Sequence, residues 1–206
     1  MKVILVNGSP HEKGCTYTAL SEVAKTLNEN GVETEIFHIG TAPVAGCIAC
    51  GACAGTGECI YKDCVGEFIE KAKEADGFVF GSPVYYSNMS GQLSSFMDRA
   101  FYCGSKYMTT KPAAAVVSCR RGGASSTFDQ INKYFTINCM PVVGSQYWNQ
   151  VHGSKAEDVL KDEEGLQTMR TLGAHMAWMI KCIEAGKAAG IEKPVREAAV
   201  KTSFIR

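Results

Sequence analysis

The chain has no long hydrophobic run and no excess of charge of either sign. Residues 1–6 are mostly apolar, but this stretch is too short for the hydrophobic region of a signal peptide, and no later stretch reaches the length of a membrane span. The 21 Lys and Arg residues balance 21 Asp and Glu residues, so no overall basic field attracts nucleic acid. We therefore expect a cytoplasmic protein whose partners include neither a membrane nor a nucleic acid.

Internal repeats, low-complexity tracts and interdomain linkers are also missing from the sequence. The 206 residues suit one domain that buries its own core. Ten cysteines in a reducing compartment favour metal ligands, redox groups or small buried side chains over disulfides. Cys103, Cys139 and Cys182 lie in apolar surroundings, which predicts that all three are core residues.

Short apolar runs alternate along the chain with stretches of helical periodicity. The runs predict strands at residues 3–6, 33–39, 77–80, 113–118 and 140–147. Between them, apolar side chains at helical spacing predict helices at residues 16–30, 65–73, 92–102 and 125–135, and a last long helix carries an apolar stripe over residues 166–183. The alternation predicts an α/β fold, a doubly wound five-stranded parallel sheet with helices on both faces.

Ligands of such sheets bind beyond the carboxyl ends of the strands, so the loop after the first predicted strand is a candidate site. Its sequence, NGSPHEKGCTYTAL, offers the hydroxyls of Ser9, Thr16 and Thr18 beside the free amides of a helix start. The three glycines of a dinucleotide fingerprint and the lysine of a P-loop are absent. The loop therefore predicts a statically held monophosphate, with a simple capped helix as the alternative.

Two further loops carry aromatic and cationic side chains. The loop after the third strand, GSPVYYSNMSG, places Tyr85 and Tyr86 where they could line one side of a planar ring. The loop after the fourth strand, SCRRGG, joins two arginines to Gly122 and Gly123, and these donors could bind the polar edge of the ring. Each loop taken alone could be ordinary surface, but together with the phosphate loop they indicate a flavin site.

Four cysteines lie within thirteen residues of the stretch CIACGACAGTGEC. Three of them, Cys47, Cys50 and Cys53, are separated by two residues each, and the glycines that follow could swing Cys59 into place as a fourth ligand. A structural zinc site usually takes its ligands as two separated pairs. The spacing therefore favours an iron–sulfur cluster, while zinc and uncommitted thiols remain as alternatives.

The segments GSPHEKGCT, GSPVYYSNMSGQL and SCRRGG resemble the FMN-contacting segments of the NADPH-dependent FMN reductase family, within the flavodoxin-like superfamily. The resemblance covers nearly the whole chain and implies one flavodoxin-like FMN-binding domain over residues 1–206. The cysteine stretch resembles that of the iron–sulfur flavoproteins, which bind a 4Fe-4S cluster. It forms an insertion at about residues 44–64, and residues 190–206 form a C-terminal extension.

The resemblance assigns roles to individual residues. It implies that the FMN phosphate is surrounded by Ser9, His11, Cys15, Thr16 and Tyr17. Thr18 offers a further hydroxyl at the same place. The resemblance implies that the isoalloxazine ring is framed by Pro83, Val84, Tyr85, Tyr86, Arg120, Arg121 and Gly122, with Gly123 in the same loop.

The expected function is that of an NAD(P)H-dependent flavin oxidoreductase that passes electrons through FMN to a small acceptor such as a flavin or a quinone. The flavin carries the chemistry, so no catalytic acid or base is expected. The alternative is an iron–sulfur flavoprotein that carries electrons between a ferredoxin-like protein and an acceptor. A zinc-binding interaction module is a third, more distant alternative. The resemblance also implies a homodimer or homotetramer.

Overall fold

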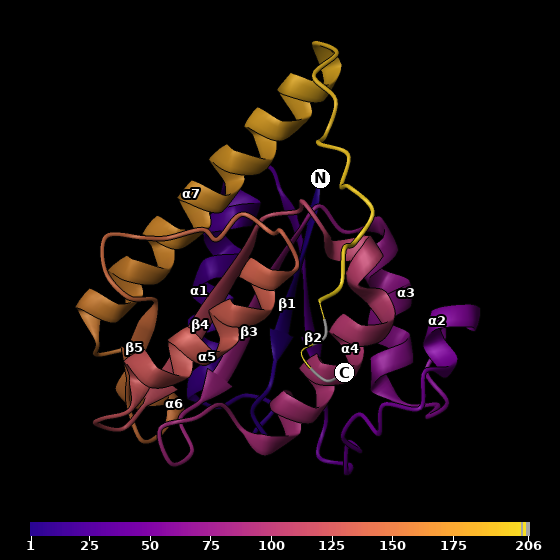
Figure 1. Cartoon of the computed structure of the whole chain (residues 1–206). Helices are drawn as coiled ribbons and strands as arrows, with labels where there is room; N and C mark the ends of the chain where they lie inside the picture. The colour runs from indigo at the N-terminus through magenta and orange to yellow at the C-terminus, as the bar shows by residue number, and fades with distance from the viewer. Residues whose placement is uncertain (203, 205–206) are drawn as a thin grey trace.

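The computed structural model describes residues 1–202 and 204, and its centre is one parallel sheet with the strand order β2-β1-β3-β4-β5 (Figure 1). All four neighbouring pairs are parallel. The strands are β1 (Lys2–Asn7), β2 (Glu33–His38), β3 (Gly77–Pro83), β4 (Ala113–Cys119) and β5 (Gln150–His152). This order reverses direction between β1 and β3, which is the place where doubly wound sheets bind their ligands.

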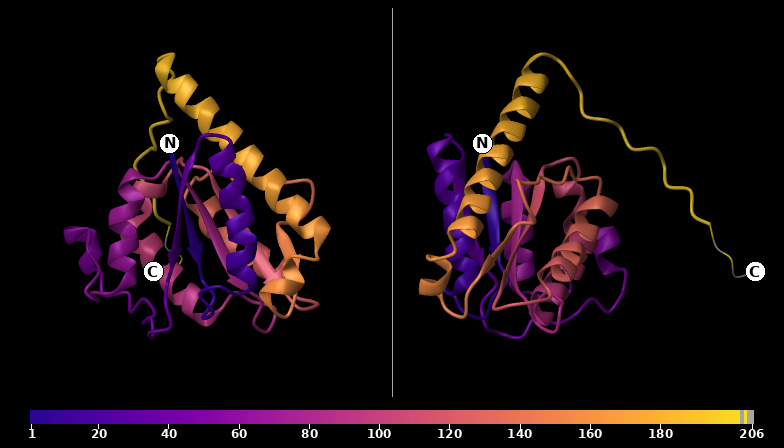
Figure 2. Two further views of the ribbon diagram at one scale, coloured as in Figure 1. Left: turned by 180° about the vertical axis from the view of Figure 1, so that it is seen from behind. Right: turned by 90° about the vertical axis from the view of Figure 1, so that its left-hand side faces the viewer.

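Helices cover both faces of the sheet (Figure 2). They are α1 (Cys15–Glu29), α2 (Ala52–Thr56), α3 (Cys64–Glu74), α4 (Gly91–Met108), α5 (Ala124–Ile137), α6 (Ala156–Val159) and α7 (Glu163–Ala188). Because successive strand residues point to opposite faces, Ile4 and Val6 pack with α3, α4 and α5, whereas Val3 and Leu5 pack with α1 and α7. The predicted five-stranded parallel fold with two covered faces is confirmed.

The predicted position of the fifth strand is wrong. Within residues 140–147 only Val142 forms a bridge, an isolated one to Ala113, whereas β5 lies at Gln150–His152 and pairs with the end of β4. The apolar run misled the prediction because it packs as a loop, with the Val143 side chain only 2% exposed. The true strand is short and largely polar, as an edge strand can be.

Two of the three cysteines predicted to be core residues are exposed. Cys139 lies in the turn after α5, and Cys182 lies on the outer face of α7, whereas Cys103 of α4 is buried. The prediction failed for the first two because the apolar neighbours in sequence point in other directions.

No helix among the described residues is both long enough and apolar enough to cross a membrane. After α7, the described residues from 191 onward form neither helix nor strand, and Figure 2 shows this segment running away from the sheet.

Candidate functional site

A cleft of about 840 Å³ opens at the carboxyl edge of the sheet. Three loops border it, the β1–α1 loop, the β3–α4 loop and the β4–α5 loop, and a segment after β5 closes its fourth side. Its volume lies within the ~300–1,000 Å³ that small-molecule sites occupy. Of the predicted site residues, the cleft is lined by Ser9, His11, Cys15, Thr16, Pro83, Val84, Tyr85 and Arg120.

The N-terminus of α1 faces this cleft without a side-chain cap. Gly14 at the N-cap position offers no side chain, and the first three helical amides, those of residues 15–17, have no acceptor among the described residues. A 15-residue helix directs its positive dipole end and these free N–H groups at the same point. The arrangement fits a phosphate or another anion.

The β1–α1 loop is shaped by its own hydrogen bonds. Asn7 Oδ1 accepts from the Ser9 amide at 3.1 Å, and Ser9 Oγ accepts from the His11 amide at the same distance. The ring of His38 on β2 contacts the Ser9 carbonyl, with 2.8 Å between Nε2 and the oxygen. Ser9 is 4% exposed, so these hydrogen bonds are largely sheltered from water.

Contacts between the start of α1, the end of β4 and the segment after β5 form the floor of the cleft. The hydroxyls of Thr16 and Ser118 lie 2.9 Å apart, which joins the start of α1 to the end of β4. Cys15 donates its thiol hydrogen to the Gly153 carbonyl at 3.6 Å. Burial raises the pKa of the Cys15 thiol, so this side chain stays protonated and is suited to packing rather than to nucleophilic attack.

The β3–α4 loop is a tight hairpin whose tip leaves the cleft. Tyr85 and Asn88 exchange backbone hydrogen bonds of 2.9 and 3.0 Å, so Tyr86 and Ser87 are the two turn residues. Both have positive φ angles, 50° and 61°, which is the geometry of a type I′ turn that usually selects glycine or asparagine. Tyr85 lines the cleft, whereas the Tyr86 side chain points to solvent and is fully exposed.

The β4–α5 loop packs directly against this hairpin. Gly123 has a φ angle of +88°, and an added Cβ would lie 2.9 Å from the Ser87 Cα. Arg120 lines the cleft, but Arg121, Gly122 and Gly123 lie outside its lining. Gly123 instead allows the two loops to approach each other.

The structure brings together most of the predicted anion and ring residues, but it places several elsewhere. Tyr17 and Thr18 lie in the first turn of α1 outside the lining, and the Thr18 hydroxyl donates to the Gly14 carbonyl at 3.1 Å. Ser118 and Cys119 of β4 and residues 153–157 also line the cleft, although they were not among the predicted site residues. The rule that ligands bind after parallel strands points to residues 153–157 once β5 is placed correctly.

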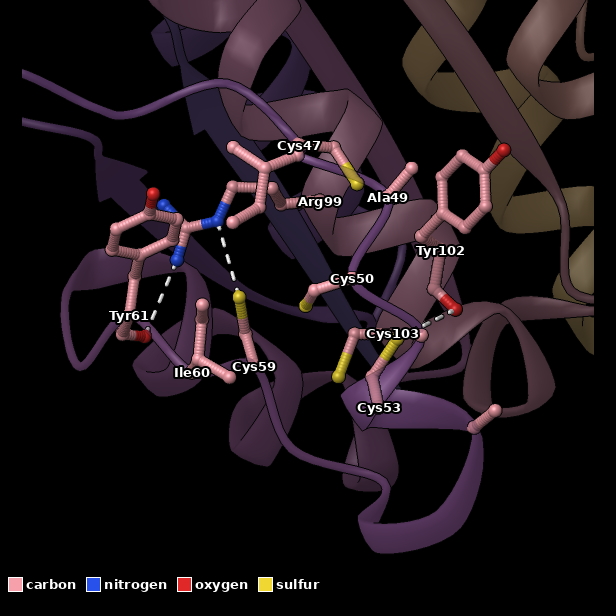
Figure 3. Close-up of a pocket in the computed structure, with 13 residues that line it drawn as sticks. Cys47, Ala49, Cys50, Cys53, Cys59, Ile60, Tyr61, Arg99, Tyr102 and Cys103 are labelled. Carbon is pink, nitrogen blue, oxygen red and sulfur yellow. Dashed lines mark hydrogen bonds between the residues drawn. The ribbon is translucent and has the colours of Figure 1, made fainter.

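The second candidate site is a pocket of about 390 Å³ between the cysteine loop and α4 (Figure 3). All four predicted ligands, Cys47, Cys50, Cys53 and Cys59, line it, and Cys103 of α4 adds a fifth thiol. Within residues 1–202 and 204, no three His, Cys, Asp or Glu side chains are grouped so that they could hold a metal ion. The loop thus brings the thiols to one cavity without arranging them around a single ion.

The cysteine pocket has an apolar wall and one buried cation. Ile48, Ile60 and Tyr102 contribute to the wall, and the guanidinium of Arg99 lies at one side. The Cys103 thiol donates to the Gly57 carbonyl at 3.1 Å, and its pKa is raised by burial and by the neighbouring cysteines. Cys103 was predicted to be an ordinary core residue, and only its contact with the loop shows that it borders this pocket.

Comparisons with known proteins agree with this architecture. An iron–sulfur flavoprotein of Methanocaldococcus jannaschii is 36% identical over 192 residues, covering 89% of this chain and all of the relative. A second one from that organism is 34% identical, covering 82% of this chain and 92% of the relative. A solved flavodoxin from the domain Archaea shares the fold with a TM-score of 0.61 at 18% identity, covering 88% of this chain and 99% of its own.

The fold is therefore flavodoxin-like, as the sequence predicted. The model of one family, NADPH-dependent FMN reductase, matches residues 1–154, which include every strand and all the loops that border the cleft. The chain belongs to the NADPH-dependent FMN reductase family.

Proposed function

We propose that the cleft binds FMN and that the protein is a flavin-dependent oxidoreductase. The observation that carries the proposal is the uncapped start of α1, whose free amides face a cleft bordered by the three loops that the sequence singled out. The FMN phosphate would accept hydrogen bonds from these amides. Family membership and the names of the relatives support the same cofactor.

The remaining lining divides between an apolar side and a polar side. Pro83, Val84 and Tyr85 offer a largely apolar surface against which the isoalloxazine would lie. Arg120 lies at the other loop, where its guanidinium would stabilise the negative charge of a reduced flavin. When bound, FMN supplies the hydride and electron chemistry, and the chain supplies binding, orientation and charge.

NAD(P)H is the proposed reductant, and a small molecule such as a flavin or a quinone is the proposed acceptor. The family name supports a nicotinamide donor. The part of the cleft that the flavin leaves open would receive both molecules in turn, because one binding region next to the ring serves a donor and then an acceptor.

We also propose that Cys47, Cys50, Cys53 and Cys59 hold a 4Fe-4S cluster. The four thiols line one pocket, and the 390 Å³ volume falls in the range of cofactor sites. Its apolar wall suits a cluster, whose potential depends on burial and on hydrogen bonds to sulfur. The names of the relatives favour this cluster and, with it, the second candidate function, an electron carrier that exchanges electrons with a ferredoxin-like protein.

Anaerobic purification followed by an absorption spectrum and by iron, sulfide and zinc analysis tests both groups. We expect a flavin spectrum, and iron and acid-labile sulfide in equal amounts near four per chain. Stoichiometric zinc without iron would contradict the cluster. Rapid mixing with NADH and with NADPH then separates the two functions, because slow reduction by both nucleotides argues for the carrier.

The α1 amides are tested by comparing FMN with riboflavin, which lacks the phosphate. If the helix start binds the phosphate, the flavin-free protein should bind FMN at least tenfold more tightly than riboflavin, which corresponds to about 1.4 kcal/mol. Equal affinities, measured by quenching of flavin fluorescence, would place the ligand elsewhere in the cleft or exclude it.

A further inference from the structure

Arg99 is an unusually buried cation for a side chain outside the flavin cleft. It lies on α4 with 1% of its side chain exposed, and it lines the cysteine pocket. A guanidinium has five N–H donors, and each of them has an acceptor here. Nε donates to Cys59 Sγ at 3.3 Å, Nη1 to the Ala45 carbonyl at 3.4 Å and to Asp63 Oδ2 at 2.6 Å, and Nη2 to the Tyr61 carbonyl at 3.3 Å and to Asp63 Oδ1 at 3.0 Å.

These acceptors lie at both ends of the cysteine insertion. Ala45 precedes the first cysteine, while Cys59, Tyr61 and Asp63 are the last cysteine and the residues that lead into α3. The guanidinium also lies 4.8 Å from the centre of the Tyr61 ring. One side chain on a packed helix therefore joins the two ends of the loop. Without it, the loop would keep contacts such as the hydrogen bond from the Cys103 thiol to the Gly57 carbonyl, which holds the middle of the loop and not its two ends.

The contact with Cys59 has a chemical consequence as well. Of the four predicted ligands, Cys59 is the one whose sulfur accepts a hydrogen bond from a charged donor among the described residues (Figure 3). Hydrogen bonds to the cysteine sulfurs and nearby charge set the potential of a cluster, because they favour its more negative, reduced state. Asp63 offsets part of the Arg99 charge, which leaves the directed N–H···S bond as the main influence.

We propose that Arg99 is the positioning residue of the cysteine pocket. It closes the pocket by joining the two ends of the loop, and its hydrogen bond to Cys59 raises the reduction potential of the cluster. The inference rests on the proposed cluster for the potential, but the closing of the loop is a property of the metal-free protein. The two parts can therefore be tested separately.

The test compares Arg99→Gln and Arg99→Lys with a matched control, Arg170→Gln. Arg170 also forms an ion pair with a glutamate, at 2.8 Å, but it lies on α7 away from the pocket. Arg99→Lys keeps the positive charge, so it can be measured even if Arg99→Gln fails to fold. Its single ammonium group cannot bind both ends of the loop as the forked guanidinium does. Retention of FMN by each variant reports that the rest of the domain is intact.

The first measurement is hydrogen exchange of residues 44–64 in the metal-free protein. We expect exchange at least tenfold faster in both Arg99 variants and no change in the Arg170 control. The second is the midpoint potential of the reconstituted cluster, followed by electron paramagnetic resonance. We expect Arg99→Gln to lower the ratio of reduced to oxidised cluster about tenfold at a fixed applied potential. For a one-electron couple this corresponds to a fall of about 59 mV in the midpoint potential.

The outcomes separate the two proposals. Absence of iron from the wild-type protein would refute the cluster, and the exchange experiment would still decide whether Arg99 closes the loop. Unchanged loop exchange in both Arg99 variants would overturn the positioning role. Faster exchange together with an unchanged potential would overturn the influence on the cluster.

Discussion

Replacement of Gly123 by alanine should disturb the flavin cleft indirectly, by pushing apart two of the loops that border it. Gly123 lies at the N-terminus of α5, where the β4–α5 loop touches the hairpin of the β3–α4 loop. A Cβ at this position would lie 2.8 Å from Ser87 Oγ, 2.9 Å from Ser87 Cα and 3.0 Å from Val84 Cγ1. Rotation of the serine hydroxyl can relieve the first contact, but the second is with backbone and requires the hairpin to move.

The cost has two parts. A side chain at a φ angle of +88° costs about 1–2 kcal/mol by analogy with left-handed residues in general. The overlap with the hairpin adds about 1–3 kcal/mol, as other insertions into packed regions do. Alanine also restricts the unfolded chain, which returns about 0.5–1 kcal/mol. The free energy of unfolding should therefore fall by about 3 kcal/mol, a large share of the ~5–15 kcal/mol that a domain has.

The assay is urea unfolding of the flavin-free protein, together with FMN titration. Gly122→Ala is the matched control, because no atom of the described structure beyond its chain neighbours lies within 4 Å of the added Cβ and its φ angle is not positive. The free energy of unfolding of the control should lie within about 0.5 kcal/mol of that of the wild type. FMN should bind at least tenfold more weakly to Gly123→Ala, since Val84 is displaced with the hairpin. Equal stability and equal affinity of the two alanine variants would refute the argument.

Three other substitutions test the core, a half-buried phenol and a helix cap. Phe68→Ala should cost about 3–5 kcal/mol in urea unfolding, because its fully buried ring contacts four other aromatic rings, and a loss below 1 kcal/mol would contradict this packing. Burial and the hydrogen bond to Asp98 raise the pKa of Tyr134 to about 12, so its contribution to stability is complete below pH 10 and is lost as the pH rises towards 12. Tyr134→Phe should therefore show a shallower loss of unfolding free energy over that range, and parallel curves would refute the assignment. Ser90→Ala should cost about 2 kcal/mol, since the buried hydroxyl donates to the Gly8 carbonyl at 2.7 Å and accepts from the Leu93 amide; thermal unfolding unchanged from wild type would count against this network.

The parts of the fold that sequence could predict are those where local pattern and tertiary contact agree. The runs at residues 3–6, 77–80 and 113–118 are almost entirely apolar because the central strands are buried on both faces. The loops after them carry the polar and glycine residues, so the cleft could be located before its geometry was known. Parallel pairing then brings these loops to one edge of the sheet.

The fourth side of the cleft could not be predicted, because it depends on the edge strand. Residues 140–147 have a stronger strand pattern than Gln150–His152, yet the ladder with β4 forms at the latter. Pairing with β4 fixes the position of β5, and burial of Val143 explains the apolar run that precedes it. The displacement of the strand hid residues 153–157 from the list of lining residues.

The cysteine pocket shows the same division between local and tertiary information. The spacing of Cys47, Cys50, Cys53 and Cys59 identified the loop side of the pocket from sequence alone. Arg99 and Cys103 are four residues apart and lie on one face of α4, but many residues of that helix share such a spacing. Only the packing of the cysteine loop in the structure shows which face of α4 it contacts.

The helix α4 connects the two candidate sites. Its N-terminus is fixed by Ser90, whose amide donates to Ser82 Oγ and whose hydroxyl donates to the Gly8 carbonyl, so the end of β3 and the β1–α1 loop both hold it. Arg99 lies eight residues after Gly91, or about 12 Å along the axis. Leu93, Phe96 and Met97, which lie between them, are fully buried and anchor this part of the helix in the core, so it should move as a unit. A substitution that releases the loop from Arg99 should therefore leave the cleft in place, whereas one that shifts the helix start at Ser90 should be felt in both sites.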